Sequence, residues 1–111
     1  MNTQRIDRFL KFVCLLKSRN LAKEACEKGY IRINGKPAKP ASWVRPGDLL
    51  ELDFPLFYRK LRVLSVPERQ LSKKIAPKFY EVLEERTREA VVRDLVDQIL
   101  QEIENPPNQE V

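Results

Sequence analysis

The segment 5–48 constrains the fold more than any other, because it places two short helical patterns directly before a glycine-punctuated β-turn unit. On a helical wheel, the apolar residues of the first pattern gather on one side, and Arg5, Arg8 and Lys11 lie on the other. Thr3 is the expected N-cap of this helix. We predict that the helix buries its apolar face and offers its cationic face to an anion; a solvated face without a partner is the alternative.

A second amphipathic helix is predicted from Ser18, a good N-cap, to about Lys28, and Gly29 ends it. Its apolar stripe consists of small side chains, which allows close packing on the first helix. Unpaired backbone N–H groups and the helix dipole favour anions at a helix N-terminus. We expect a phosphate site there, formed by Lys17, Ser18, Arg19, Asn20 and Lys23.

The charge of the chain also favours an anionic partner. Lys and Arg number 21 against 16 Asp and Glu, and the sequence pI is near 9.4, which favours polyanions such as RNA. Residues 1–93 carry all 21 basic side chains, whereas residues 94–111 carry five acidic and no basic ones. The acidic tail is expected to aid solubility; weakening non-specific RNA contacts is the alternative.

The dipeptide Asn34-Gly35 is the strongest simple hairpin signal in the chain. It follows a short alternating segment, Tyr30–Ile33, and Lys36 comes directly after it. By itself the turn predicts only a hairpin. Because lysines flank it, the turn is also a candidate RNA-contacting edge, and we expect Asn34 and Lys36 to make the contacts.

Two further strands are predicted after this hairpin, at residues 49–53 and 61–66, and they extend a small twisted sheet. The bent apolar connection at 54–58 is interpreted as core closure, with a docking patch as the alternative. Trp43 is interpreted as core or rim packing, with base stacking as the alternative.

The composition changes after Pro67 to a basic linker, and helical spacing then runs from Pro77 to about Glu104. The apolar stripe of this helix is expected to fold back on the small domain; pairing with a second copy or with a partner protein stays open. The predicted fold class is α+β, a compact helix-loop-helix with a small twisted β-sheet and a C-terminal helical extension. The predicted divisions are 1–66 for the compact domain, 67–104 for the linker and C-terminal helix, and 105–111 for a disordered tail.

Residues for catalysis, for a metal or for a cofactor are not predicted. The chain has no histidine, no glycine-rich phosphate loop and no nucleophile–base pair. Cys14 and Cys26 fall on apolar helical faces and are expected to be reduced core residues, with a reactive or disulfide-forming role as the alternative. No apolar run approaches the roughly 20 residues of a membrane span, so we expect a cytoplasmic protein without membrane contact.

Several short stretches occur in an order and at spacings that are more specific than any single motif. They are Arg5–Leu10, Lys17–Arg19, Ala22–Lys23, Gly29, Ile31–Lys36 and Pro46–Asp48. Together they closely resemble the S4 RNA-binding domain, named after a small-subunit ribosomal protein, over roughly the first half of the chain. The resemblance implies a helix–loop–helix and an adjoining β-turn that contact structured RNA.

A stand-alone domain of this type with a short extension resembles the ribosome-associated fifteen-kilodalton heat-shock protein and the small bacterial ribosome quality-control factors. The stretches 9–11, 16–23 and 36–42 are similar to the latter group. That resemblance implies a factor that binds ribosomal RNA and tRNA on a large ribosomal subunit carrying peptidyl-tRNA, while a partner protein extends the nascent chain. Arg5 and Arg19 match the arginines of that family's RNA-contacting surface.

We therefore predict a non-enzymatic, monomeric RNA-binding protein of the ribosome, without cofactor or metal. The alternatives are a protein-interaction adaptor and an accessory subunit of an RNA-modifying enzyme. The expected RNA-binding residues are Arg5, Arg8, Lys11, Lys17, Ser18, Arg19, Asn20, Lys23, Asn34 and Lys36.

Overall fold

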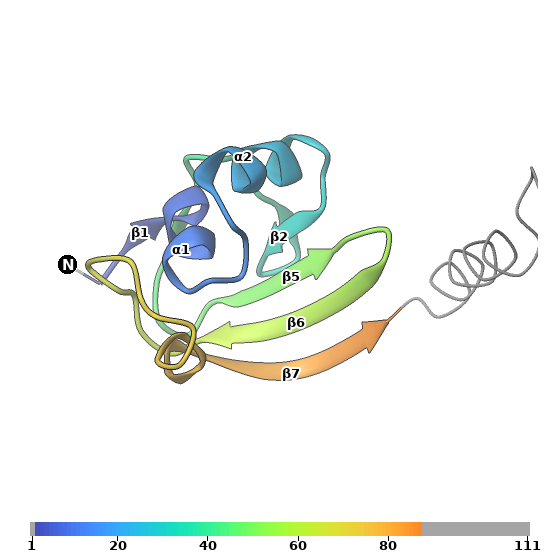
Figure 1. Ribbon diagram of the computed structural model, residues 1–111. Coiled ribbons are helices and arrows are strands. Elements are labelled where there is room, and N and C mark those ends of the chain that lie inside the picture. The colour runs from blue at the N-terminus through green and yellow to red at the C-terminus, as the bar shows by residue number, and fades with distance from the viewer. Residues whose placement is uncertain (1, 88–111) are drawn as a thin grey trace, which may run out of the picture.

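The computed structural model describes residues 2–87, in which two helices lie on one side of an antiparallel sheet (Figure 1). The helices are α1, Ile6–Phe12, and α2, Arg19–Glu27. The sheet has the strand order β3-β2-β5-β6-β7, and these strands are Lys36–Pro37, Ile31–Ile33, Leu49–Asp53, Phe57–Val63 and Tyr80–Thr87. The predicted α+β class is confirmed. The C-terminal helix predicted beyond residue 87 and the tail at 105–111 lie outside the described residues.

The core lies between the helices and one face of the sheet. α1 contributes Ile6, Phe9 and Leu10, which follow the i, i+3, i+4 spacing of a buried helical face and have no exposed surface. On β5, Leu50 and Leu52 are buried on the facing side because side chains alternate along a strand. The apolar face predicted for the first helix therefore packs on the sheet, and its opposite face stays on the surface.

α2 begins as predicted at Ser18, whose hydroxyl oxygen accepts a hydrogen bond from the N–H of Leu21 at 3.1 Å. The small side chains of its stripe are buried against the rest of the domain: Ala22, Ala25 and Cys26. Burial, together with nearby carboxylates, raises the pKa of the Cys26 thiol to about 11. This thiol is therefore protonated at neutral pH and a poor nucleophile.

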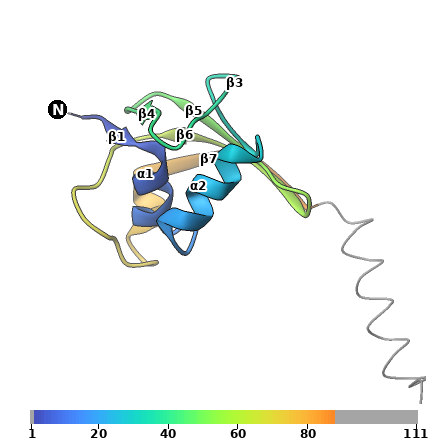
Figure 2. The same ribbon diagram turned by 90° about the horizontal axis from the view of Figure 1, so that it is seen from above.

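The start of α1 differs from the prediction, because its N-cap is Arg5 and not Thr3. The residues before the helix form a short strand, β1, Gln4–Arg5, which pairs with β4, Trp43–Val44 (Figure 2). Pairing across nearly forty residues thus fixes where the helix begins, in place of a local side-chain cap. The Arg5 side chain makes no capping hydrogen bond.

The helix predicted from Pro77 onward is wrong for residues 80–87, which form β7 and complete the sheet. A 3-10 turn, Ala76–Phe79, precedes the strand. The register between β6 and β7 shifts at Lys60/Leu61, a bulge that interrupts the two-residue alternation. For this reason, apolar and polar residues do not alternate regularly along β7. β6 also begins earlier than predicted, because Phe57 and Tyr58 belong to the strand and not to the connection before it.

The segment predicted as a linker packs against the C-terminal end of α1. The Gln70 side-chain amide donates hydrogen bonds to the carbonyls of Lys11 at 3.1 Å and Phe12 at 3.4 Å. The Leu71 N–H donates to the same Phe12 carbonyl at 3.0 Å. These contacts satisfy carbonyls that the end of a helix leaves unpaired. The division of the chain at residue 66 stays a prediction, although the sheet continues past it. Among residues 2–87, no helix combines the length and the apolar character that crossing a membrane requires.

Candidate RNA-binding surface

Two arginines from different elements converge on one carboxylate where α1 meets α2. Asp7, in the first turn of α1, has a side chain only 6% exposed. Its Oδ2 accepts hydrogen bonds from Nη2 of Arg5 at 3.1 Å and from Nη2 of Arg19 at 3.4 Å. Its other oxygen accepts the backbone N–H of Arg8 at 2.7 Å. The structure thus brings together the two arginines that the family resemblance singles out.

The arginines of this cluster stay available to an external anion. Their side chains are 44% and 49% exposed, and a guanidinium has five N–H donors, of which each arginine gives one to Asp7. Two cations share one anion, so the cluster carries a net positive charge. Asp7 orients both guanidinium groups without neutralising them, which suits binding of a phosphate.

The remaining cations of α1 are placed by neighbouring side chains. The Arg8 guanidinium lies over the Phe12 ring, 4.8 Å from its centroid. This contact positions the guanidinium while the residue stays exposed. Lys11 Nζ donates to Oε1 of Gln70 at 3.0 Å. That bond uses one of three ammonium donors, and the other two can still reach a phosphate.

A surface depression of about 410 Å³ lies beside the loop between the two helices. Lysines from three separate segments line it: Lys11, Lys17 and Lys73. None of its lining residues is acidic, so its charge is positive. Lys11 and Lys17, both predicted to contact RNA, therefore line the same depression.

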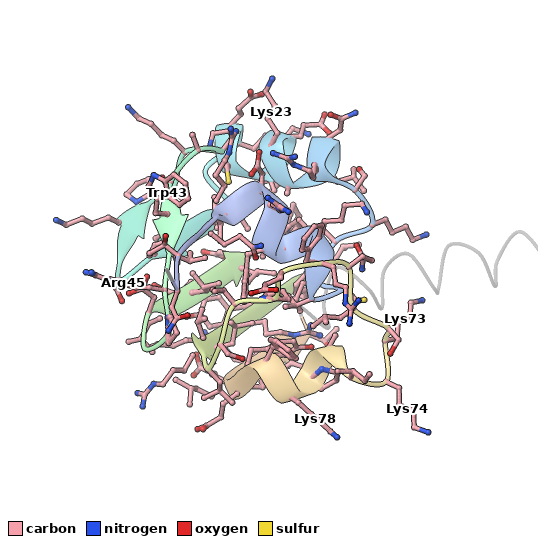
Figure 3. All side chains as sticks on the ribbon, turned by 90° about the vertical axis from the view of Figure 1, so that its left-hand side faces the viewer. Lys23, Trp43, Arg45, Lys73, Lys74 and Lys78 are labelled. Atoms are coloured by element: carbon pink, nitrogen blue, oxygen red, sulfur yellow. The ribbon has the colours of Figure 1, made fainter. Side chains whose placement is uncertain are left out.

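The N-terminus of α2 carries the other predicted contacts. Asn20 and Lys23 are exposed, and Figure 3 shows Lys23 pointing outward from α2. The Ser18 hydroxyl oxygen already accepts the Leu21 N–H, so only its O–H remains to donate. Ser18 thus shapes the helix end as well as facing solvent.

Asn34 has a structural role that the sequence did not reveal. Its side-chain oxygen accepts the Leu49 N–H at 2.9 Å, and its amide nitrogen donates to Oδ1 of Asp48 at 3.1 Å. Asn34 also has a φ of 52°, a left-handed conformation that asparagine tolerates. These bonds tie the 34–35 turn to the 45–48 turn, while Lys36 is exposed on the edge strand β3.

The structure adds surface residues that sequence reasoning did not select. Trp43 is 64% exposed, so of the two packing interpretations core packing is wrong, and rim packing stays a prediction. In Figure 3, Trp43 and Arg45 lie on one side of α1, and Lys73 and Lys74 lie on the other. Lys73 and Lys74 belong to the segment interpreted as a linker. No local sequence pattern indicates that this segment packs on α1.

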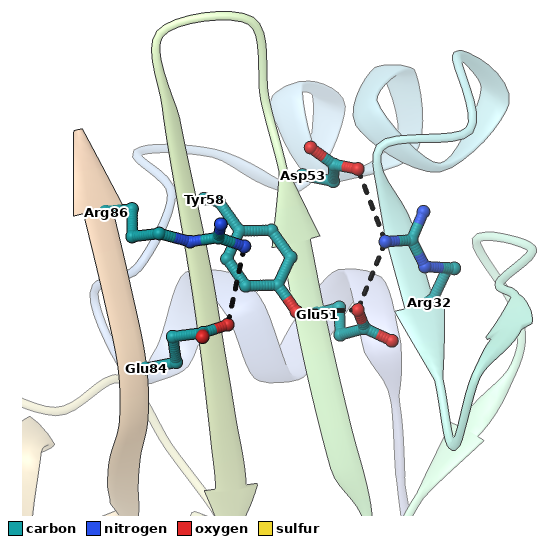
Figure 4. Close-up of polar contacts among 6 residues, drawn as sticks. All are labelled: Arg32, Glu51, Asp53, Tyr58, Glu84 and Arg86. Atoms are coloured by element: carbon teal, nitrogen blue, oxygen red, sulfur yellow. Dashed lines mark hydrogen bonds and ion pairs between the residues drawn. The ribbon is translucent and has the colours of Figure 1, made fainter. Parts of the chain in front are cut away.

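Charges on the opposite face of the sheet are largely paired with one another (Figure 4). Arg32 contacts Oε2 of Glu51 at 3.1 Å and Oδ2 of Asp53 at 3.3 Å. The Tyr58 hydroxyl donates to Glu51 at 2.7 Å. The hydrogen bonds from Arg32 and Tyr58 lower the pKa of Glu51, and the bond to Glu51 raises the pKa of Tyr58 to about 12. This face therefore attracts polyanions less than the helix side.

Comparison with known proteins agrees with this arrangement. The S4 domain family matches residues 4–50, which contain both helices and the two linked turns. The fold and the matched segment define the chain as an S4-domain protein. It is 41% identical over 91 residues to the RQC P-site tRNA stabilizing factor of Listeria innocua, an alignment that covers 79% of this chain and 96% of that protein. The identity to the factor of the same name from Bacillus subtilis is 42% over 83 residues, or 73% and 93% of the two chains. The chain belongs to the family of RQC P-site tRNA stabilizing factors.

A solved structure supports the fold independently. The trimeric heat shock protein 15 of Vibrio cholerae aligns with a TM-score of 0.66 and 20% identity, over 91% of this chain and 98% of that one. Together with the matched S4 segment and the relatives above, it confirms the predicted resemblance to the S4 domain, to the quality-control factors and to the fifteen-kilodalton heat-shock protein.

Proposed function

We propose that this chain is a non-enzymatic, cytoplasmic factor that binds ribosomal RNA and tRNA on the large ribosomal subunit. Its role is the rescue or quality control of stalled ribosomes that carry peptidyl-tRNA. The observation that carries the proposal is the cluster at Asp7, which presents Arg5 and Arg19 together within the segment matched by the S4 domain. The names of the relatives, which refer to a P-site tRNA, support it.

The proposed contacts, which we call the strip, come from the residues at the start of and along α1, from the start of α2 and from the adjoining turn. Cationic side chains bind phosphates, and polar side chains at the start of α2 donate hydrogen bonds. Asn34 acts by holding its turn in shape, because its amide is already bonded within the protein. The strip consists of Arg5, Arg8, Lys11, Lys17, Ser18, Arg19, Asn20, Lys23 and Lys36.

Recognition on this strip depends on RNA shape and phosphate position. A-form RNA hides the base edges of its major groove, and phosphate contacts set register without reading sequence. If about six phosphates are neutralised, log affinity falls with log salt concentration with a slope of roughly −4 to −5.

The test is sedimentation of the full chain with ribosomes through a sucrose gradient, with and without induced stalling. We expect wild type to enrich with large subunits after stalling, and Arg19→Ala to lose that enrichment. Arg62→Ala is the matched control, since Arg62 is exposed on β6 next to core residue Leu61 and therefore points to the opposite face of the sheet. Equal sedimentation of both variants with wild type would contradict the proposal.

The adaptor alternative has one observation in its favour, an apolar groove of about 270 Å³ between α2 and the β5–β6 turn. Leu21, on its wall, is 44% exposed. Removing residues 88–111 leaves the described sheet whole, whereas a cut at residue 67 would also remove β7. If RNA binding survives the shorter cut and ribosome association does not, a protein contact carries the specificity. The partner that extends the nascent chain and the monomeric state stay predictions.

A further inference from the structure

The indole of Trp43 is exposed without a packing reason in the fold. Trp43 is the single tryptophan of the chain, and 64% of its surface is accessible. Tryptophan has one of the largest apolar surfaces among the residues, and small domains usually bury most of it. Exposure of this residue beside a cationic surface points to a ligand with a flat, polarisable face.

The β1–β4 ladder places the indole next to the arginine cluster. Gln4 pairs with Val44 and Arg5 pairs with Trp43 in antiparallel register. Val44 is fully buried and Gln4 nearly so, whereas Arg5 and Trp43 are both exposed. Side chains of directly opposed residues project from the same face of a ladder, with Cβ atoms about 5 Å apart. Trp43 is therefore next to Arg5, the residue whose guanidinium Asp7 holds.

A second cation and a polar depression complete the surroundings of the indole. A depression of about 250 Å³ is lined by Trp43, by Arg45 and by the bonded pair Asn34 and Asp48. Figure 3 shows Trp43 and Arg45 on the same side of the molecule. An unpaired nucleotide matches this set, because its base can stack on an aromatic ring while its phosphates meet arginines. A fully paired helix offers no free base face except at its ends.

We propose that Trp43 is a stacking platform for an unpaired nucleobase of the bound RNA. The inference rests on the proposed function and deepens it, since it adds a single-stranded feature to a surface that otherwise reads phosphate positions. Arg5 and Arg45 hold the phosphates on either side of the stacked base.

The test uses the tryptophan emission of the full-length protein, excited at a wavelength that tyrosine does not absorb, so that it reports on Trp43 alone. The protein is titrated with an RNA hairpin that has an unpaired loop and, separately, with a blunt duplex of the same stem. We expect the loop RNA to quench the emission and the duplex to bind without quenching it. Equal quenching by both, or by neither while both bind, overturns the inference.

Variants measured by anisotropy of labelled RNA separate stacking from apolar contact. Trp43→Ala should lower the affinity for loop RNA by about 5- to 150-fold, the range for loss of one base–aromatic stack. Trp43→Phe should retain most of the affinity, Trp43→Leu should not, and none should change duplex affinity or the salt slope. Circular dichroism confirms that each variant is folded. Wild-type affinity of Trp43→Leu for loop RNA overturns stacking.

Two outcomes separate this inference from the proposed function. If wild type binds neither RNA, the proposed function fails and the inference fails with it. If wild type binds both and Trp43→Ala loses ribosome association with RNA affinity unchanged, the indole contacts a protein, and the stacking inference alone is overturned.

Discussion

The shared carboxylate of Asp7 predicts that Arg5 and Arg19 are coupled in stability. When alanine replaces one of the two arginines, Asp7 still contacts the other arginine and the backbone N–H of Arg8. Both arginine side chains are nearly half exposed, so each pair contributes about 0.5 kcal/mol after screening by solvent. Each single variant should therefore lose no more than about 1 kcal/mol of unfolding free energy.

The double variant Arg5→Ala/Arg19→Ala removes the last cation from a carboxylate that is only 6% exposed. An unpaired buried charge costs about 2 kcal/mol or more, although water entering where the arginines were reduces the penalty. We expect the double variant to lose at least about 1 kcal/mol more than the sum of the singles. Adding Asp7→Asn should recover most of that excess, because the amide carries no charge.

Urea unfolding followed by circular dichroism resolves this coupling. With a slope of about 1 to 3 kcal/mol/M for a small domain, an excess of about 1 kcal/mol moves the midpoint by roughly 0.3 to 1 M. Additive losses within about 0.5 kcal/mol would refute the reasoning, because Asp7 would then be satisfied without the arginines. The single variants should meanwhile each reduce the salt slope of RNA binding by about 0.9, with the fold intact.

Two further predictions concern the rest of the domain. The hydrogen bond to Glu51 raises the pKa of Tyr58 to about 12. The stability that this bond gives the fold is therefore complete below the unfolded pKa, near 10, and is lost as the pH rises to about 12. Tyr58→Phe should cost about 1.5 kcal/mol at pH 7 in urea unfolding, and its difference from wild type should shrink toward pH 12; a difference that does not change with pH would contradict this. Gln70→Glu keeps the side-chain length but loses the amide donors to the end of α1, and we expect a loss of about 1 kcal/mol; an unchanged urea midpoint would show that water replaces these bonds.

Local chemistry explains which parts of the fold were predictable. Ser18 and Gly29 bracket α2, and Asn34-Gly35 forms the turn after β2, because caps and tight turns depend on a few adjacent residues. The pairing of β6 with β7 joins residues 17 to 30 positions apart and contains a bulge, so no local periodicity predicts it.

The candidate site divides in the same way. Cationic faces follow from helical spacing, so the cations of α1 and α2 could be selected from the sequence. The shared use of Asp7 could not, because an acidic residue in a first turn also suits the helix dipole alone. The exposure of Trp43 depends on pairing with β1, and Gln70 acts across nearly sixty residues, so neither could be predicted from local sequence.

The outer strand β7 has a consequence for how the molecule approaches its partner. Its exposed residues include Glu81, Glu84 and Glu85, and Figure 1 places the strand at the far side of the domain from α2. Glu84 and Glu85 are paired with Arg86 and Arg59, so this side of the domain attracts a polyanion less than the helix side does, and the unequal attraction exerts a torque before contact. Encounters with RNA are thereby biased toward the helix side, and the charged border also discourages a second chain from extending the sheet.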